Sequence, residues 1–188
     1  YRTYCEPPKR RTTCRIETDP GDLVQVDYAK MGLLFDSVAG RRRNLYAFIG
    51  TLAHSRHKFV EFTFKQDQRS FTASHVRMFE SFGGVPSRIA LDNLKAGVIK
   101  PDLYDPEINR TYQEMAEHYG CFLDPCRVAK PKDKAKVERD VQTVRQQFYK
   151  LLTTDPQADI QALNSGIASW LKNDYGQKAH GSTGIPPY

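Results

Sequence analysis

Hydrophobic and polar positions alternate, fully or in part, in two early segments of the chain, and a third segment between them is apolar almost throughout. Alternation with a period of two places side chains on the two faces of an extended strand, whereas a short continuous apolar run fits a strand buried on both faces. Two later apolar runs are short and bounded by turn residues, which also indicates strands. A basic turn at 41–44 is expected directly before the apolar segment at 45–52. The expected strands are 22–29, 45–52, 58–64, 87–91 and one beginning at 121–123.

Helices are expected in four other segments, where apolar residues recur at steps of three and four. Glycine commonly ends a helix, and Gly83 and Gly120 mark the ends of the first two. The expected helices are 68–82, 107–119, one that starts near residue 134, and 158–175.

The order of these elements is three strands, then helix, strand, helix, strand, helix. Such an order predicts an α/β fold with a mixed five-stranded sheet and helices on both faces, in which three strands form an antiparallel meander and two follow helical crossovers. We expect residues 22–152 to form this core. Residues 1–21, rich in Pro, Thr and Arg, are expected as a basic arm, and residues 153–188 as a C-terminal helical extension and linker.

The charge balance changes the range of expected partners. Hydrophobic residues make up 39% and charged residues 27% of the chain, which argues against wholesale disorder or a fibrous repeat. No apolar run approaches the roughly 18 residues of a bilayer span, so no membrane partner is expected. The formal net charge of +6 favours a polyanion, with DNA as the leading choice. Within the arm, Lys9, Arg10 and Arg11 are expected DNA contacts.

The four cysteines do not suggest chemistry. Cys5, Cys14, Cys121 and Cys126 are too irregularly spaced for a disulfide framework or a zinc site of the CxxC type. Reduced thiols are therefore expected. No histidine lies in a recognisable motif that would activate a nucleophile.

Two aspartates stand where a plain surface acid is least expected. Asp27 interrupts an apolar strand, although aspartate is depleted in strands and costly to bury without a partner. Asp92 directly follows an apolar run, at the end of an expected central strand, and open α/β sheets place their sites outside strand ends. Structural alternatives remain open: a salt-bridged acid for Asp27, and a turn or cap formed by Asp92 and Asn93.

A third acid, Glu138, flanks the apolar stripe of the third helix and can therefore face a site at the edge of the sheet. The alternative is a solvated glutamate that pairs with Arg145 or Lys134. The stripe consists of Val137, Val141, Val144, Phe148 and Leu151.

Basic residues crowd the start of the same helix, where positive charge opposes the helix dipole. An anionic partner such as a DNA phosphate would offset that repulsion, and an ordinary solvated run is the alternative. The expected DNA contacts here are Lys130, Lys132, Lys134, Lys136 and Arg139.

Three carboxylates supply the oxygen ligands that Mg²⁺ or Mn²⁺ prefers. Two such ions about 3.5–4 Å apart stabilise both the attacking and the leaving oxygen of an in-line displacement at phosphorus. This chemistry requires neither a nucleophilic side chain nor a histidine base. Asp27, Asp92 and Glu138 are thus candidate catalytic residues and candidate ligands of two metal ions, and the structural alternatives given above stay open at this point.

Three sequence blocks read QVDY at 25–28, ALDNLK at 90–95 and PKDKAKVER at 131–139. They resemble the signature blocks of the DDE transposases and retroviral-type integrases. Within that group the blocks resemble the IstA-type transposases of bacterial insertion sequences, and the likeness covers residues 18–150 strongly. The resemblance implies a ribonuclease H-like core with Asp27, Asp92 and Glu138 as its metal-binding triad. The interval between Asp92 and Glu138 is longer than in retroviral integrases, which favours the transposase branch.

The resemblance also implies an activity and partners. It implies the catalytic domain of a DNA transposase, a polynucleotidyl transferase that cleaves transposon 3′ ends and transfers them to target DNA. A homo-oligomer, a separate AAA+ helper ATPase and the bacterial cytoplasm are implied as its setting. The alternatives are a ribonuclease H-like nuclease that only hydrolyses and a catalytically inactive DNA-binding assembly module.

Overall fold

The computed structural model describes residues 18–91, 98–100, 107–125, 131–181 and 183–188. Within these ranges the backbone alone is described for 98–100, 107–108, 125 and 131–138.

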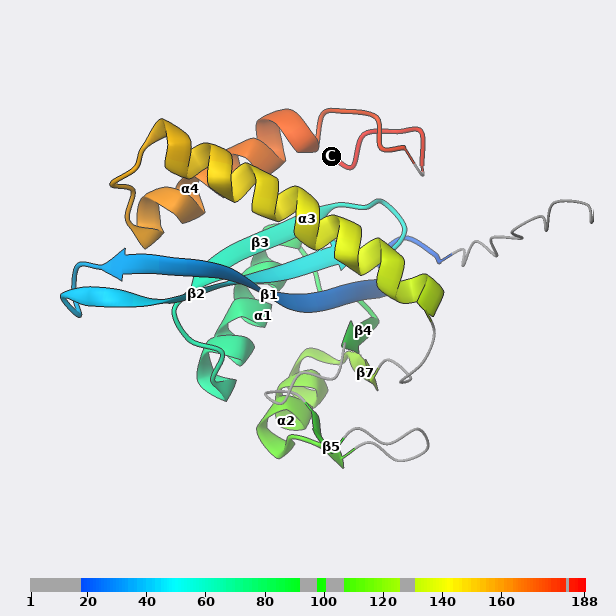
Figure 1. The fold of residues 1–188 in the computed structure, drawn as a ribbon. Coiled ribbons are helices and arrows are strands. Elements are labelled where there is room, and N and C mark those ends of the chain that lie inside the picture. The colour runs from blue at the N-terminus through cyan, green and yellow to red at the C-terminus, as the bar shows by residue number, and fades with distance from the viewer. Residues whose placement is uncertain (1–17, 92–97, 101–106, 126–130, 182) are drawn as a thin grey trace, which may run out of the picture.

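A mixed five-stranded sheet forms the centre of the fold (Figure 1). Its strands follow the spatial order β3-β2-β1-β4-β7. The pairs β1–β2 and β2–β3 are antiparallel, whereas β1–β4 and β4–β7 are parallel. This is the predicted meander followed by two crossover strands. The strands are β1 (Leu23–Asp36), β2 (Arg41–Leu52), β3 (Lys58–Thr63), β4 (Arg88–Leu91) and β7 (Phe122–Pro125).

Helices cover both faces of the sheet, as predicted. In Figure 1, α3 and α4 lie above the sheet, and α1 and α2 lie below it. A small separate sheet pairs β5 with β6. The bounds are α1 (Gln68–Phe82), α2 (Arg110–Tyr119), α3 (Pro131–Thr154), α4 (Ile160–Trp170), a π-helix (Leu171–Tyr175), β5 (Val98–Lys100) and β6 (Glu107–Ile108).

The alternation of side chains along β1 divides the apolar interior into two cores. Val24 and Val26 point to the core shared with α1 and α2, whereas Ala29 joins the core shared with α3 and α4. Asp27 has the same parity as Ala29, so it lies on the face that α3 covers. The sequence pattern of one strand thus decides which helix meets the aspartate.

Local side-chain chemistry explains why α1 begins and ends where the pattern predicts. The Asp67 carboxylate accepts a 2.9 Å hydrogen bond from the Ser70 backbone N–H and caps the first turn. At the other end Gly83 has a φ of 68°, in the left-handed region that glycine adopts without strain.

The first hairpin differs from the expectation. Residues 41–44 belong to β2 and are not a turn, and β1 runs on to Asp36. The turn lies at 37–40, because the Asp36 carboxylate accepts hydrogen bonds from the backbone N–H groups of Val38 and Ala39 at 3.0 and 3.1 Å. Aspartate commonly closes turns in this way.

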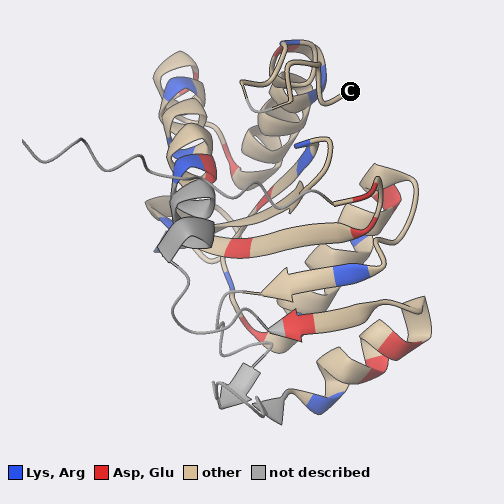
Figure 2. Ribbon diagram, turned by 90° about the vertical axis from the view of Figure 1, so that its right-hand side faces the viewer, with Lys and Arg blue, Asp and Glu red and all other residues tan. Residues whose placement is uncertain are grey.

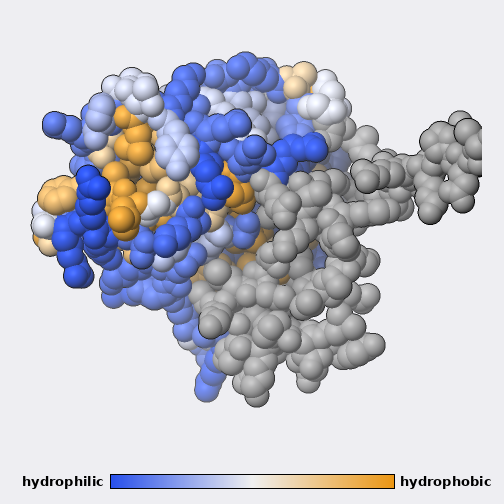
Figure 3. Space-filling model, viewed as in Figure 1, coloured by the Kyte–Doolittle hydropathy of each residue, from blue (hydrophilic) through white to orange (hydrophobic). Residues whose placement is uncertain are grey.

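This hairpin projects from the sheet, to the left in Figure 1. It exposes Leu33, Phe35 and Val38 at 62%, 57% and 97%. Hydrophobic residues gather among hydrophilic ones in the left half of the same face in Figure 3.

The second expected helix begins later than predicted. Residues 107–108 form β6, and α2 begins at Arg110. The reason is Asn109, whose side chain accepts a 3.1 Å hydrogen bond from the Thr111 backbone N–H and so fixes the helix start.

Helix α4 packs on the sheet beside α3 (Figure 1). Leu163 and Ile167 of α4 belong to the core that α3 closes. Asn164 pairs with the edge strand β3: its side-chain oxygen accepts from Phe62 N–H at 2.6 Å and its side-chain nitrogen donates to Phe62 C=O at 3.1 Å. The division of the chain at residue 152 stays a prediction.

His75 of α1 is a buried histidine. Its Nε2 lies 3.1 Å from the Tyr112 hydroxyl and its Nδ1 lies 2.9 Å from the Phe71 carbonyl oxygen. Burial lowers the pKa of His75 to about 4, because the charged imidazolium would lose its hydration.

We expect His75 to lower the free energy of unfolding by about 3 kcal/mol between pH 7 and pH 4. Its pKa is about 4 in the folded chain and about 6.5 in the unfolded chain. As the pH falls the unfolded chain therefore binds the proton first, so the stability present above pH 6.5 is lost towards pH 4. Urea unfolding of wild type and His75→Gln at both pH values measures the difference. The exposed His118→Gln is the control, and equal pH dependence in all three proteins would contradict the assignment.

Candidate metal and phosphoryl-transfer site

Asp27 lies in the first half of β1 and shares a pocket with Asp140 and Val141 of α3. Its side chain is partly buried, and its Oδ1 accepts a 2.7 Å hydrogen bond from the Tyr28 backbone N–H. A small pocket opens beside it between β1, β2 and α3. The pocket is lined by Gln25, Asp27, Ile49, Thr51, Asp140 and Val141.

Asp92 lies outside the described residues, but the strand that leads to it is described. The predicted neighbourhood of the first and fourth strands is confirmed, because β1 pairs with β4 in parallel. The last register pair is Val26 with Leu91. These two residues immediately precede Asp27 and Asp92 in the sequence.

Glu138 lies on α3, and its side chain is outside the described residues. The stripe that was expected to hold this helix against the sheet is confirmed where side chains are described. Val144 and Phe148 are buried, and Val141 and Leu151 are partly buried against the same core. Glu138 is one helical turn before Val141, which lines the pocket beside Asp27.

Asp140 lines the candidate site and was not identified from the sequence. It is buried, lines the same pocket as Asp27, and forms ion pairs with Arg56 and Lys58 at 2.8 and 3.0 Å. A signal was available, since Asp140 stands three residues after Val137 and four before Val144, inside the apolar stripe. A charged residue in that position requires a buried partner.

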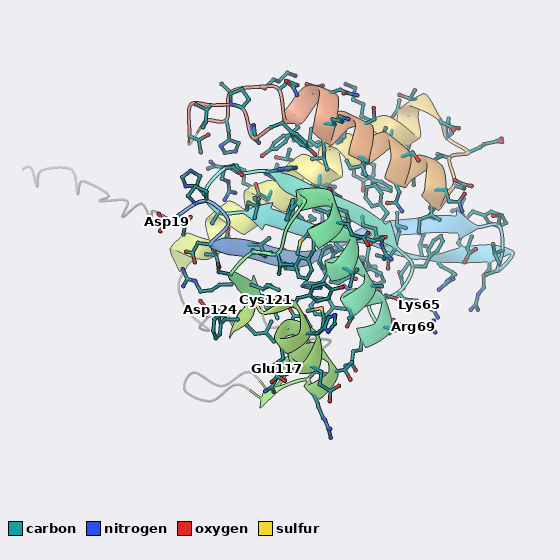
Figure 4. The ribbon with its side chains drawn as sticks, turned by 180° about the vertical axis from the view of Figure 1, so that it is seen from behind. Asp19, Lys65, Arg69, Glu117, Cys121 and Asp124 are labelled. Atoms are coloured by element: carbon teal, nitrogen blue, oxygen red, sulfur yellow. The ribbon has the colours of Figure 1, made fainter. Side chains whose placement is uncertain are left out.

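A further acid lies on the third parallel strand. Asp124 of β7 is exposed and is paired in register with Ala90 of β4 (Figure 4). Ala90 is paired in turn with Gln25 of β1. Asp124 thus lies near the same end of the sheet as Asp27, two strands away.

The expected DNA contacts are only partly described. Arg139 is exposed on α3, where basic and acidic residues are close together directly after the grey start of the helix (Figure 2). Lys132, Lys134 and Lys136 belong to α3, with the backbone alone described. The remaining expected contacts, Lys9, Arg10, Arg11 and Lys130, lie outside the described residues.

Among the residues whose side chains are described, no three His, Cys, Asp or Glu groups come together as a metal cluster. That set excludes Asp92 and the Glu138 side chain, so the predicted triad stays a prediction. None of the helices in the described part of the chain could span a bilayer. Cys121 is a buried free thiol whose pKa is raised by burial, which disfavours the reactive thiolate. Cys5, Cys14 and Cys126 lie outside the described residues.

Several solved structures with the same fold are retroviral integrases. The HTLV-2 integrase catalytic core domain, solved in complex with magnesium, superposes with a TM-score of 0.60 at 16% identity, covering 89% of this chain and 94% of that one. A chain of the simian T-cell lymphotropic virus intasome gives a TM-score of 0.67 at 15% identity, covering 89% of this chain and 53% of that one. Identities this low show the ribonuclease H-like fold alone.

Sequence relatives are bacterial transposases. A Mycobacterium tuberculosis protein assigned as a transposase is 47% identical over 153 residues, which are 81% of this chain and 37% of that protein. The transposase of insertion sequence IS21 from Pseudomonas aeruginosa is 32% identical over 152 residues, 79% of this chain and 38% of that protein. The chain thus spans less than half the length of these relatives.

The family model described as the integrase core domain matches residues 17–131. That range contains β1 and β4, and with them two of the three signature blocks. The chain therefore belongs to the integrase core domain family, and its relatives within that family are the IstA-type transposases of bacterial insertion sequences.

Proposed function

We propose that this domain cleaves the 3′ ends of a transposon and joins them to target DNA, with Asp27, Asp92 and Glu138 as its metal-binding residues. The observation that supports this most is the parallel pairing of β1 with β4. Its register runs up to Val26 and Leu91, and an aspartate follows each of them in the sequence. Neighbouring parallel strands advance together, and on this basis we propose that the carboxylates of Asp27 and Asp92 share one metal site.

The donor set fits Mg²⁺ or Mn²⁺. Besides Asp27, two polar side chains that line the pocket present oxygen atoms, those of Gln25 and Thr51. Mg²⁺ prefers oxygen and usually takes only one or two carboxylates together with substrate phosphate oxygens. We propose two ions, because the reaction has an attacking and a leaving oxygen to stabilise.

In the proposed reaction, water first attacks a phosphodiester at the transposon end and the bond to the 3′ oxygen breaks. The released 3′-hydroxyl then attacks a target phosphodiester, a new P–O bond forms, and the target 3′ oxygen leaves as a hydroxyl. Bound metal ions would stabilise the charge on the phosphoryl oxygens. The chain supplies rigid placement: Asp27 stands on a central strand, and the Tyr28 N–H orients its carboxylate.

DNA is the proposed partner for both steps, in agreement with the net charge of +6. We also propose that the full protein works as a homo-oligomer with a separate AAA+ helper ATPase in the bacterial cytoplasm. The bacterial origin of the relatives supports this setting.

The test is a strand-transfer assay of the full-length protein with a transposon-end duplex and a target plasmid in Mg²⁺. We expect joined product, and none with Asp92→Asn. Nicking without joining would identify a hydrolytic nuclease instead. Neither product, together with failure to bind Mn²⁺, would identify an inactive assembly module.

A further inference from the structure

A buried charge cluster lies between the sheet and α3. The Asp140 Oδ2 atom lies 2.8 Å from Arg56 Nη2, and the Oδ1 atom lies 3.0 Å from Lys58 Nζ. All three side chains are nearly inaccessible, with exposed fractions of 12%, 8% and 1% for Asp140, Arg56 and Lys58. Burial lowers the pKa of Lys58, and the Asp140 charge opposes that shift. The negative charge of Asp140 and the positive charges of Arg56 and Lys58 therefore stabilise one another in this buried position.

The C-terminal segment completes this cluster. The Tyr175 hydroxyl pairs with the Lys58 ammonium and donates a 3.3 Å hydrogen bond to the Arg56 carbonyl oxygen. The ammonium also lies 4.4 Å from the centre of the Tyr175 ring, within cation–π range. We refer to Arg56, Lys58, Asp140 and Tyr175 as the Asp140 cluster.

The backbone at Arg56 shows that this arrangement is held firmly. Arg56 has a φ of 65°, and among the described residues it alone adopts a positive φ without being glycine. Such a conformation is unfavourable for arginine and persists where the surroundings fix it. Here the ion pair with Asp140 and the hydrogen bond from the Tyr175 hydroxyl to the Arg56 carbonyl oxygen fix the backbone.

The cluster lies at the point where α3 passes over the candidate site. Asp140 lines the pocket together with Asp27. It follows Glu138 by two residues, a rise of about 3 Å along the helix. The next deeply buried contact of α3 is Val144, about one turn further on. The Asp140 cluster is therefore the nearest described anchor to Glu138.

We propose that Asp140 is a positioning residue, whose ion pairs with Arg56 and Lys58 fix the turn of α3 that carries Glu138 over Asp27. This inference rests on the proposed function. An apolar side chain would hold the helix against the sheet equally well. Directional ion pairs from both carboxylate oxygens also fix its rotation and its position along the axis. Because both of its oxygens are already paired with Arg56 and Lys58, we assign Asp140 to positioning and not to the proposed metal ligands.

Asp140→Asn in the full-length protein tests the inference, because asparagine keeps the shape and removes the charge. We expect the Mg²⁺ concentration for half-maximal strand transfer to rise about 10- to 100-fold, the range for residues that orient metal ligands. Mn²⁺ binding to the protein–DNA complex, followed by electron paramagnetic resonance, should weaken by a similar factor. Affinity for the DNA end should stay unchanged.

The matched control is Asp36→Asn. Asp36 has a similarly buried side chain, 8% exposed, and forms a 2.5 Å ion pair with Arg43 in the β1–β2 hairpin, away from the pocket. We expect it to lower the melting temperature without changing either metal measurement. Lys58→Met is a second test variant, because it removes one cation from Asp140 and keeps the length of the side chain. Lys58→Met should weaken metal binding, as Asp140→Asn does.

Each outcome of these experiments bears on either the positioning role or the proposed function. If wild type joins DNA, and Asp140→Asn and Lys58→Met need no more metal than wild type, the positioning role is wrong while the proposed function stands. If neither variant folds, the cluster is purely structural and the positioning role is rejected. If wild type itself shows no metal-dependent joining, the proposed function fails first and the inference with it.

Discussion

Asp27→Asn, Asp92→Asn and Glu138→Gln are each expected to reduce DNA cleavage and strand transfer by about a thousandfold or more. Each change removes one negative charge from the proposed metal site and leaves the side-chain shape nearly intact. Bound metal provides several kcal/mol of transition-state stabilisation, and each 1.36 kcal/mol corresponds to a factor of ten in rate. The measurement is the rate of joined product with the full-length protein in Mg²⁺.

Asp124→Asn is the control for these variants, because Asp124 is an exposed acid at the same end of the sheet and is not a proposed ligand. It should retain activity. Thermal melting should show that all four variants fold. A folded variant of the proposed triad with near-normal strand transfer would remove that residue from the site.

DNA affinity is expected to fall about 10⁴-fold between 50 and 200 mM salt. Eight lysine and arginine residues are proposed to contact phosphates, and each contributes about −0.9 to the slope of log affinity against log salt. Sequence preference should be slight, since phosphate contacts carry no sequence information directly. The proposed contacts are Lys9, Arg10, Arg11, Lys130, Lys132, Lys134, Lys136 and Arg139.

Replacing Lys9, Arg10 and Arg11 together by glutamine should make that slope shallower by about 3. Arg110→Gln is the control, because Arg110 is exposed on α2 and already pairs with Glu114 at 2.9 Å. A wild-type slope near zero would contradict phosphate binding. An unchanged slope in the triple variant would exclude the N-terminal arm.

The parts of the fold that could be predicted from the sequence are those governed by local patterns. The bounds of α1 follow from its apolar stripe, its Asp67 cap and Gly83. The place of Asp27 within a strand and of Asp92 after one follows from the apolar runs around them. The parallel pairing of β1 with β4 follows from the crossover that the intervening helix provides.

The parts that could not be predicted depend on contacts distant in sequence. Asp140 meets Arg56 across 84 positions, and Lys58 meets Tyr175 across 117. No periodicity within α3 or β3 pairs such residues. The hairpin turn was misplaced for a different reason, because the run of arginines at 41–43 suggested a solvated turn while Asp36 already closed one.

The pairing of α4 with β3 has a consequence for the order in which the protein is made. β3 is an edge strand, and Asn164 occupies the Phe62 N–H and C=O groups on its open side. A ribosome synthesises these partners a hundred residues apart. Until α4 emerges, the nascent chain displays an unpaired strand edge with apolar side chains, the type of surface that recruits chaperones or other nascent chains. By pairing with β3, α4 therefore covers part of a strand edge that would otherwise be open to pairing with another chain.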